Sequence, residues 1–173
     1  MLQTAIKKIV ITGAESSGKT TLAQQLATYC AVPLMPEYAR EYLELLQRPY
    51  QQPDLLQIAK EHVRREDACI ATATASYIFL DTDLLTIKIW SEYKYGNCAP
   101  WILQQIMQRK YDLYLLCSPD MPWQYDPLRE NPHNRHEIFE LYWRQLTQLN
   151  ATFAVLSGDE EHRFQQAKRL IGV

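Results

Sequence analysis

Residues 13–20 read Gly13-Ala14-Glu15-Ser16-Ser17-Gly18-Lys19-Thr20, which fits the phosphate-binding pattern G-x-x-x-x-G-K-[ST]. The β-branched segment 6–12 before this loop predicts a buried strand, and residues 21–27 after it predict a helix. In that context the two glycines let backbone N–H groups approach phosphate oxygens, and the helix N-terminus adds partial positive charge. The motif therefore predicts a P-loop that binds a nucleotide.

The residue types of the loop assign roles to its members. In a P-loop the lysine reaches the β- and γ-phosphates, and the hydroxyl that follows it ligates Mg²⁺. We therefore expect ATP and Mg²⁺ as cofactors, with Lys19 catalytic and Thr20 a metal ligand. The residues expected to contact the nucleotide are Gly13, Glu15, Ser16, Ser17, Gly18, Lys19, Thr20 and Thr21.

Composition limits the classes of protein. The chain has 173 residues and is 47% hydrophobic and 22% charged, which predicts one globular P-loop domain over residues 1–173. A net charge of −2 gives no basic field for nucleic acid, and no apolar run is long enough for a membrane span. The first residues carry no signal-peptide pattern, and the four cysteines have no zinc spacing. We expect a cytoplasmic protein that binds neither nucleic acid nor a membrane; the oligomeric state stays open.

Strand-like and helix-like segments alternate along the chain. Strands are expected at 6–12, 31–36, 77–80, 113–117 and 152–156, with helices at 21–27, 37–46, 53–74, 84–93, 100–110, 137–149 and after 159. This alternation predicts an α/β fold: a parallel five-stranded sheet with helices on both faces. Ligands of such sheets bind at the carboxyl ends of the strands.

Acidic residues follow two of the expected strands. Asp81 ends a buried strand, where the acidic residue of a P-loop Mg²⁺ site is expected, and Asp83 is predicted to contact the substrate. The alternative is a helix N-cap, a role open to Asp81, Thr82 or Asp83. Glu37 follows the second strand, where it could deprotonate or orient a substrate hydroxyl, or simply favour a helix N-terminus.

Three arginines are candidates for binding phosphate. Arg40 lies three residues after Glu37 and could bind phosphate or pair with Glu44. The segment 118–135 is too long for a plain connector and is predicted to be a lid, with Arg129 and Arg135 catalytic and Trp123 packing it down. The alternative is a proline-stiffened surface loop.

Four motifs occur in a characteristic order: residues 13–22, Glu37-Tyr38-Ala39-Arg40-Glu41, Asp81-Thr82-Asp83, and Pro122-Trp123 with Asp126-Pro127-Leu128-Arg129. Together they resemble the ribosylnicotinamide kinase domain of NadR-type bacterial NAD-regulator proteins and their stand-alone AAA-like relatives, over nearly the whole chain. The resemblance implies a P-loop kinase that uses ATP and Mg²⁺ to phosphorylate the 5′-hydroxyl of nicotinamide riboside. It also implies that Asp81 and Asp83 lie near the metal and the ribose hydroxyls.

This chain departs from that family at two positions whose side chains would stack on the nicotinamide base. The family's kinases carry a stacking tryptophan where this chain has Pro36, and a second stacking tyrosine where it has Lys94. We expect the acceptor to be chosen by a face that includes the substrate-binding residues Tyr38, Trp90 and Tyr93, together with Pro36 and Tyr95. The rival interpretations are a nucleotide-dependent switch that lacks a small-molecule acceptor and a kinase of another nucleoside or small alcohol.

Overall fold

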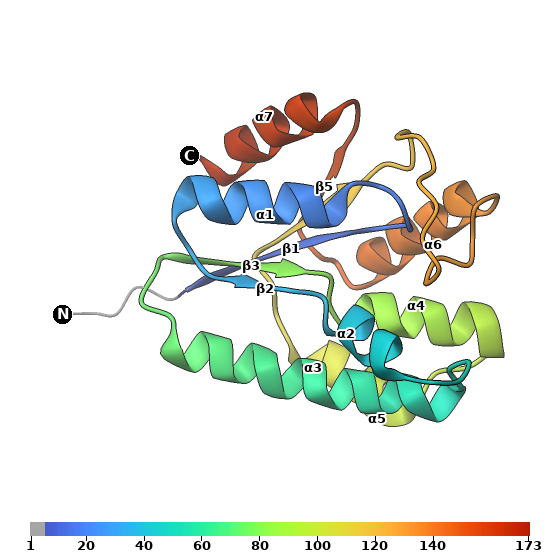
Figure 1. The fold of residues 1–173 in the computed structure, drawn as a ribbon. Coiled ribbons are helices and arrows are strands. Elements are labelled where there is room, and N and C mark those ends of the chain that lie inside the picture. The colour runs from blue at the N-terminus through green and yellow to red at the C-terminus, as the bar shows by residue number, and fades with distance from the viewer. Residues whose placement is uncertain (1–5) are drawn as a thin grey trace.

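The computed structural model describes residues 6–173. Its centre is a parallel sheet of five strands: β1 (Lys7–Gly13), β2 (Leu34–Met35), β3 (Tyr77–Asp81), β4 (Leu113–Cys117) and β5 (Phe153–Leu156). They lie in the order β2-β3-β1-β4-β5, so the strand that precedes the P-loop is central (Figure 1). In the register, Ile11 is opposite Asp81 of β3 and Leu115 of β4.

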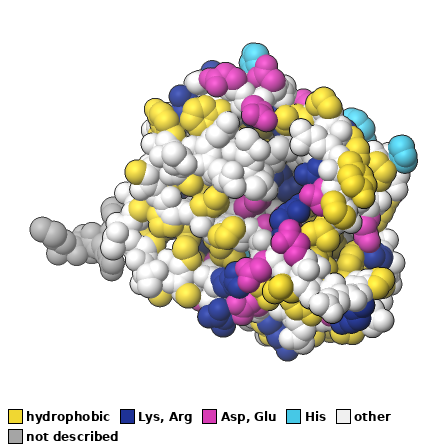
Figure 2. Space-filling view, viewed as in Figure 1, with side chains coloured by type: hydrophobic (Ala, Val, Ile, Leu, Met, Phe, Trp, Pro, Cys, Tyr) yellow, Lys and Arg dark blue, Asp and Glu magenta, His cyan; other side chains and the backbone are white. Residues whose placement is uncertain are grey.

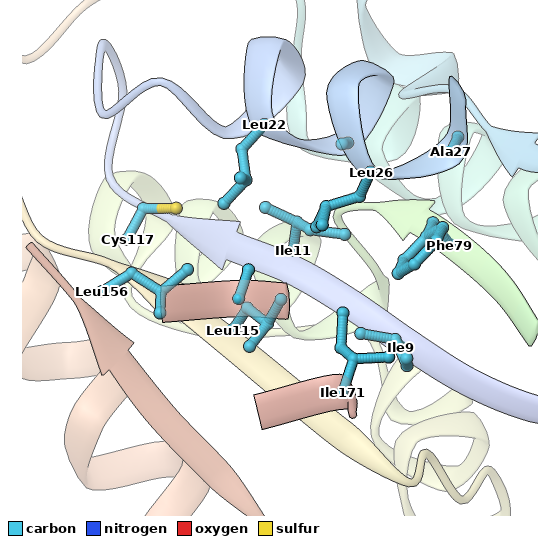
Figure 3. Packing of buried hydrophobic residues seen from close by; sticks show 12 residues of the cluster. Ile9, Ile11, Leu22, Leu26, Ala27, Phe79, Leu115, Cys117, Leu156 and Ile171 are labelled. Carbon is cyan, nitrogen blue, oxygen red and sulfur yellow. The ribbon is translucent and has the colours of Figure 1, made fainter. Parts of the chain in front are cut away.

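The first face of the sheet is covered by α1 (Lys19–Cys30) and α7 (Glu160–Ile171), which lie side by side in Figure 1. Side chains of neighbouring residues point to opposite faces of a strand, so Ile9 and Ile11 of β1 both pack on this side. Figure 3 shows Ile9 and Ile11 among Leu22, Leu26 and Ile171 in this core. The first and last helices are thereby fixed beside the P-loop strand.

The second face is covered by α4 (Leu84–Tyr95) and α6 (Arg135–Gln148), whose apolar residues meet Val10 of β1 and Leu116 of β4. An outer group consists of α2 (Tyr38–Leu45), α3 (Gln52–Thr72) and α5 (Pro100–Gln108), which pack with α4 in a further core cluster. Helix α4 therefore packs against both the sheet and this outer group.

The predicted fold class is confirmed: the sheet is parallel, has five strands and carries helices on both faces. The largest difference is β2, predicted over 31–36 but formed only by Leu34 and Met35 at the sheet edge. Pro33 and Pro36 flank these residues and have no N–H to donate to a neighbouring strand, which limits the length of this strand. The predicted domain and the signal-peptide prediction include residues 1–5, which lie outside the described part of the chain.

Polar segments gather at the carboxyl end of the sheet. The P-loop follows β1, Glu37 follows β2 closely, Asp81 ends β3, and the irregular segment 118–134 follows β4. Within residues 6–173, no helix is long and apolar enough to cross a membrane. The topology thus brings four predicted site segments to one edge of the sheet.

Candidate active site

The P-loop has the backbone form that its glycines require. Gly13 has φ 140°, and a Cβ there would lie 2.6 Å from the Cys117 carbonyl oxygen. Gly18 has φ 78° and is the N-cap residue of α1. Inside the loop, the Ser17 hydroxyl and the Lys19 ammonium both donate to the Ala14 carbonyl, at 2.7 and 2.8 Å. Lys19 is thus held at the loop by a bond that it can exchange for a phosphate oxygen.

Thr20 and Asp81 form a pair at the start of α1. The Thr20 hydroxyl donates to Asp81 Oδ2 at 2.7 Å, and Asp81 is buried. Burial raises the pKa of this carboxyl, while the Thr20 hydrogen bond and the nearby Lys19 charge lower it. Asp81 Oδ1 is also buried and has no hydrogen-bond partner among residues 6–173. A buried carboxylate oxygen without a partner, next to a P-loop hydroxyl, fits a Mg²⁺ site.

Glu37 lies just before α2 and lines the same cavity as Lys19 and Thr20. Burial raises the pKa of its carboxyl; the Lys19 charge lowers it, and the Asp81 charge raises it further. A carboxylate with a raised pKa is a stronger base, so its position and its pKa both suit a proton acceptor.

Residues 118–135 form hydrogen bonds with two residues of the P-loop. The Glu15 carboxylate accepts from the backbone N–H of Glu130 at 3.1 Å and of Asn131 at 2.8 Å. The Ser16 hydroxyl accepts from the Gln124 N–H at 2.9 Å, and Arg135 donates to the Ser16 carbonyl at 3.1 Å. We call residues 118–135, which are predicted to form a lid, the lid; they contact the P-loop at Glu15 and Ser16.

The lid arginines surround Trp123. The guanidinium carbons of Arg129 and Arg135 lie 6.0 and 5.7 Å from its ring centroid. Arg129 lines the P-loop cavity, whereas Arg135 also donates to the Met121 carbonyl at 2.9 Å. Arg40 pairs with the lid residue Asp126 at 3.0 Å and, more loosely, with Glu44 at 3.7 Å. All three arginines therefore contact the lid or lie within it.

Two cavities adjoin at this edge. The P-loop cavity has a volume of about 150 Å³ and is lined by residues 15–21, Glu37, Arg40 and Arg129, among others. The aromatic cavity has about 260 Å³ and is lined by Tyr50, Trp90 and Tyr93, among others. Trp90, Glu15, Leu43 and Leu128 line both. Figure 2 shows basic and acidic side chains gathered along a hollow on this face.

The structure does not bring every predicted residue to the cavities. Asp83 is 2% exposed; its carboxylate caps α4 through the Leu85 N–H and accepts from the Tyr114 hydroxyl at 2.8 Å. The structure places Asp83 at the N-cap of α4, a role that the sequence left open, and not among the lining residues of either cavity; its contact with a substrate stays a prediction. Tyr38 is also not among the lining residues of either cavity: its ring packs on Tyr42 and lies 4.2 Å from the Arg65 guanidinium.

The predicted acceptor face is only partly assembled. Trp90 and Tyr93 line the aromatic cavity, but Pro36 and Tyr95 are not among its lining residues. Lys94 lines the cavity instead: its ammonium lies 3.8 Å from the Tyr50 ring centroid and 2.9 Å from the Glu130 carboxylate. Sequence patterns missed Tyr50, because it lies in an irregular segment that no motif marks.

These observations define a class of protein. A parallel sheet whose central strand leads into a P-loop, with an acidic residue on the neighbouring strand beside the loop's threonine, is the architecture of P-loop nucleotide-binding proteins. The chain belongs to the AAA domain family, which matches residues 8–163.

The comparisons also confirm the resemblance to NadR-type proteins. The chain is 29% identical to the trifunctional NAD biosynthesis/regulator protein NadR of Escherichia coli (strain K12), over 96% of its own length and 42% of that protein. The NadR protein of Salmonella typhimurium is 28% identical over the same shares. The chain thus spans less than half the length of these curated relatives.

Solved structures share the fold at lower identity. A NadR protein in complex with NR has a TM-score of 0.77 at 22% identity, over 98% of this chain and 52% of that one. A thymidylate kinase from Ehrlichia chaffeensis has a TM-score of 0.71 at 14% identity, over 96% and 98%. A deoxyadenosine kinase from M. mycoides has a TM-score of 0.67 at 13% identity, over 95% and 98%. The fold is therefore that of P-loop nucleoside and nucleotide kinases.

Proposed function

We propose that this chain is an ATP-dependent kinase that transfers the γ-phosphoryl group to the 5′-hydroxyl of nicotinamide riboside. The observation that carries the proposal is the pair of adjoining cavities, because a kinase must hold a phosphate donor and an acceptor side by side. The P-loop cavity suits the polyphosphate, and the aromatic cavity suits a planar base. The matches to NadR proteins, one of them solved with NR, support this choice of acceptor.

In this proposal the P-loop residues bind the donor. Lys19 exchanges its bond to the Ala14 carbonyl for β- and γ-phosphate oxygens, and backbone N–H groups of the loop hold the same phosphates. Arg129 lines the lid side of this cavity, and its positive charge stabilises the negative charge that develops on the transferred phosphoryl group. Arg135 keeps the lid on the loop through Ser16 and Met121.

Glu37 and Asp81 have different roles: Glu37 acts on the acceptor hydroxyl, and Asp81 belongs to the metal site. Glu37 lines the cavity, accepts the proton of the acceptor hydroxyl and holds that oxygen in line with the γ-phosphorus. Asp81 and Thr20 would hold Mg²⁺, which when bound neutralises charge on the β- and γ-phosphates. Among the described residues, no three His, Cys, Asp or Glu side chains gather into a metal site of their own.

Stacking in the aromatic cavity holds the acceptor. Trp90 and Tyr93 come from α4, and Tyr50 from the segment before α3, so the cavity offers three aromatic side chains. Each good aromatic pair adds about 0.5–1.5 kcal/mol beyond area burial. Tyr50 and Trp90 thereby replace the stacking side chain that the family carries at the position of Pro36.

The alternative function is a nucleotide-dependent switch that has no small-molecule acceptor. Such a switch would need a surface that binds a partner protein. The large exposed hydrophobic side chains are spread over five helices, the lid and the C-terminal residue, at Tyr29, Leu45, Leu103, Met107, Tyr125, Trp143, Leu170 and Val173. A single-partner surface would gather such side chains. The aromatic cavity beside the P-loop favours a small acceptor instead.

A screen of acceptors tests the proposal. ADP release from MgATP is measured with nicotinamide riboside, other ribosides, deoxyribosides and a non-nucleoside alcohol. We expect kcat/KM to be highest for nicotinamide riboside, with Lys19→Ala as the inactive control. If a non-nucleoside alcohol exceeds it about a hundredfold, a gap of about 2.7 kcal/mol, the riboside assignment is wrong although the kinase assignment stands.

A further inference from the structure

Arg163 is a buried charged residue outside both cavities. It lies in the first turns of α7 and is 1% exposed. Its guanidinium donates to three backbone carbonyls, those of Ser17, Ser118 and Gly158, and to the carboxylate of Asp120. A guanidinium has five N–H donors in a planar fork, so a single side chain can serve all four acceptors.

One of these acceptors belongs to the P-loop. In a trans peptide the carbonyl and the next residue's N–H point in opposite directions, and the structure describes no cis peptide in residues 6–173. Because the Ser17 carbonyl faces Arg163, the Gly18 N–H points away from Arg163. Gly18 lines the P-loop cavity, and loop N–H groups that point into it are the ones that bind phosphate.

Two other acceptors lie where the lid begins. Ser118 follows β4 directly, and its carbonyl accepts from Arg163 at 2.9 Å. Asp120 is the side-chain partner of Arg163 and also accepts from the Gly158 N–H at 2.8 Å. The same guanidinium therefore ties the P-loop, the start of the lid and the turn before α7 to one another.

We propose that Arg163 is a positioning residue for nucleotide binding: it fixes the Ser17–Gly18 peptide with its N–H toward the phosphates and anchors the lid to that peptide. A flipped peptide would present the Ser17 carbonyl oxygen to the phosphates and repel them. This inference rests on the nucleotide-binding part of the proposed function. It adds a residue that touches neither nucleotide nor acceptor.

The test compares Arg163→Lys and Arg163→Met with Ile171→Ala. Lysine keeps the charge but lacks the fork, and methionine removes every donor. Ile171 is a matched control, because it is a core residue of the same helix, eight residues and roughly 12 Å further along it. MgADP affinity is measured by calorimetry at a temperature where each variant is folded. The chain has five glycines, so glycine-selective ¹⁵N labelling gives few enough amide signals to follow Gly18 directly.

We expect MgADP to shift the Gly18 amide signal in the wild type and in Ile171→Ala, with similar affinity. In Arg163→Lys the shift should shrink and affinity should fall about tenfold, with a larger loss in Arg163→Met. Arg163 variants that match Ile171→Ala in both readouts would overturn the inference; if the methionine variant does not fold, the lysine variant decides. A wild type that binds no MgADP would instead refute the proposed function.

Discussion

The buried carboxyl of Asp83 should make the stability of the fold depend on pH. Burial raises its pKa from 3.8 to about 6, although hydrogen bonds from Tyr114 and Leu85 oppose that rise. A raised pKa means that the folded state binds the proton of Asp83 more tightly than the unfolded state does. Protonation therefore stabilises the fold: the stabilisation is fully present below pH 3.8 and is lost as the pH rises through about 6. At 1.36 kcal/mol per pKa unit, the loss is about 3 kcal/mol.

Asp83→Asn should remove this pH dependence. Asparagine stays neutral, its side-chain oxygen can still accept from the Leu85 N–H, and its amide can face the Tyr114 hydroxyl. The unfolding free energy of the variant minus that of the wild type should therefore rise by about 2.4 kcal/mol between pH 4 and pH 7.5. Urea titrations at several pH values measure this difference. A difference that stays flat, or that falls with pH, would refute the placement of Asp83 as a buried cap.

Three further predictions concern the cavities. Lys19→Ala should abolish phosphoryl transfer with little change in melting temperature, because Lys19 bonds only to Ala14 within the loop; steady-state turnover and thermal melts check both. Glu37→Gln should lower kcat by about a hundredfold or more. In the wild type, kcat should fall as the pH drops through the raised pKa of Glu37, and a pH–rate profile that keeps its acid limb in the glutamine variant would contradict this role. Trp90→Ala should raise KM for nicotinamide riboside about tenfold, while Trp143→Ala on α6 should leave KM unchanged; equal effects of the two would argue against stacking.

Local patterns in the sequence predicted the P-loop and the position of Asp81 beside it. The P-loop and the strand ending at Asp81 are contiguous segments, and the parallel topology brings them together at one edge. Asp83 could not be placed in the same way. Thr82 has φ 71°, so the chain turns between the two aspartates, and strand alternation no longer relates their side chains. Asp81 stays beside Thr20, whereas Asp83 points beneath α4.

Residues that act through tertiary contacts carried no sequence signal. Arg163 lies in a polar segment that begins Glu160-Glu161-His162, and nothing in that pattern predicts a fully buried guanidinium. Its partners lie 43 to 146 positions away along the chain, apart from the nearby Gly158. Likewise, the acidic Glu15 is a variable position of the P-loop pattern, yet it accepts backbone N–H groups of the lid. Such contacts follow from how α7 and the lid pack on the loop.

Identification of the product tests the central claim most directly. The purified chain is incubated with MgATP and nicotinamide riboside, and phosphorus NMR with mass spectrometry follows the γ-phosphoryl group. We predict a phosphomonoester at the 5′-oxygen of the riboside, formed in equal amount to ADP and absent with Lys19→Ala. Release of inorganic phosphate alone, at a rate that does not depend on the riboside concentration, would contradict the assignment as a riboside kinase.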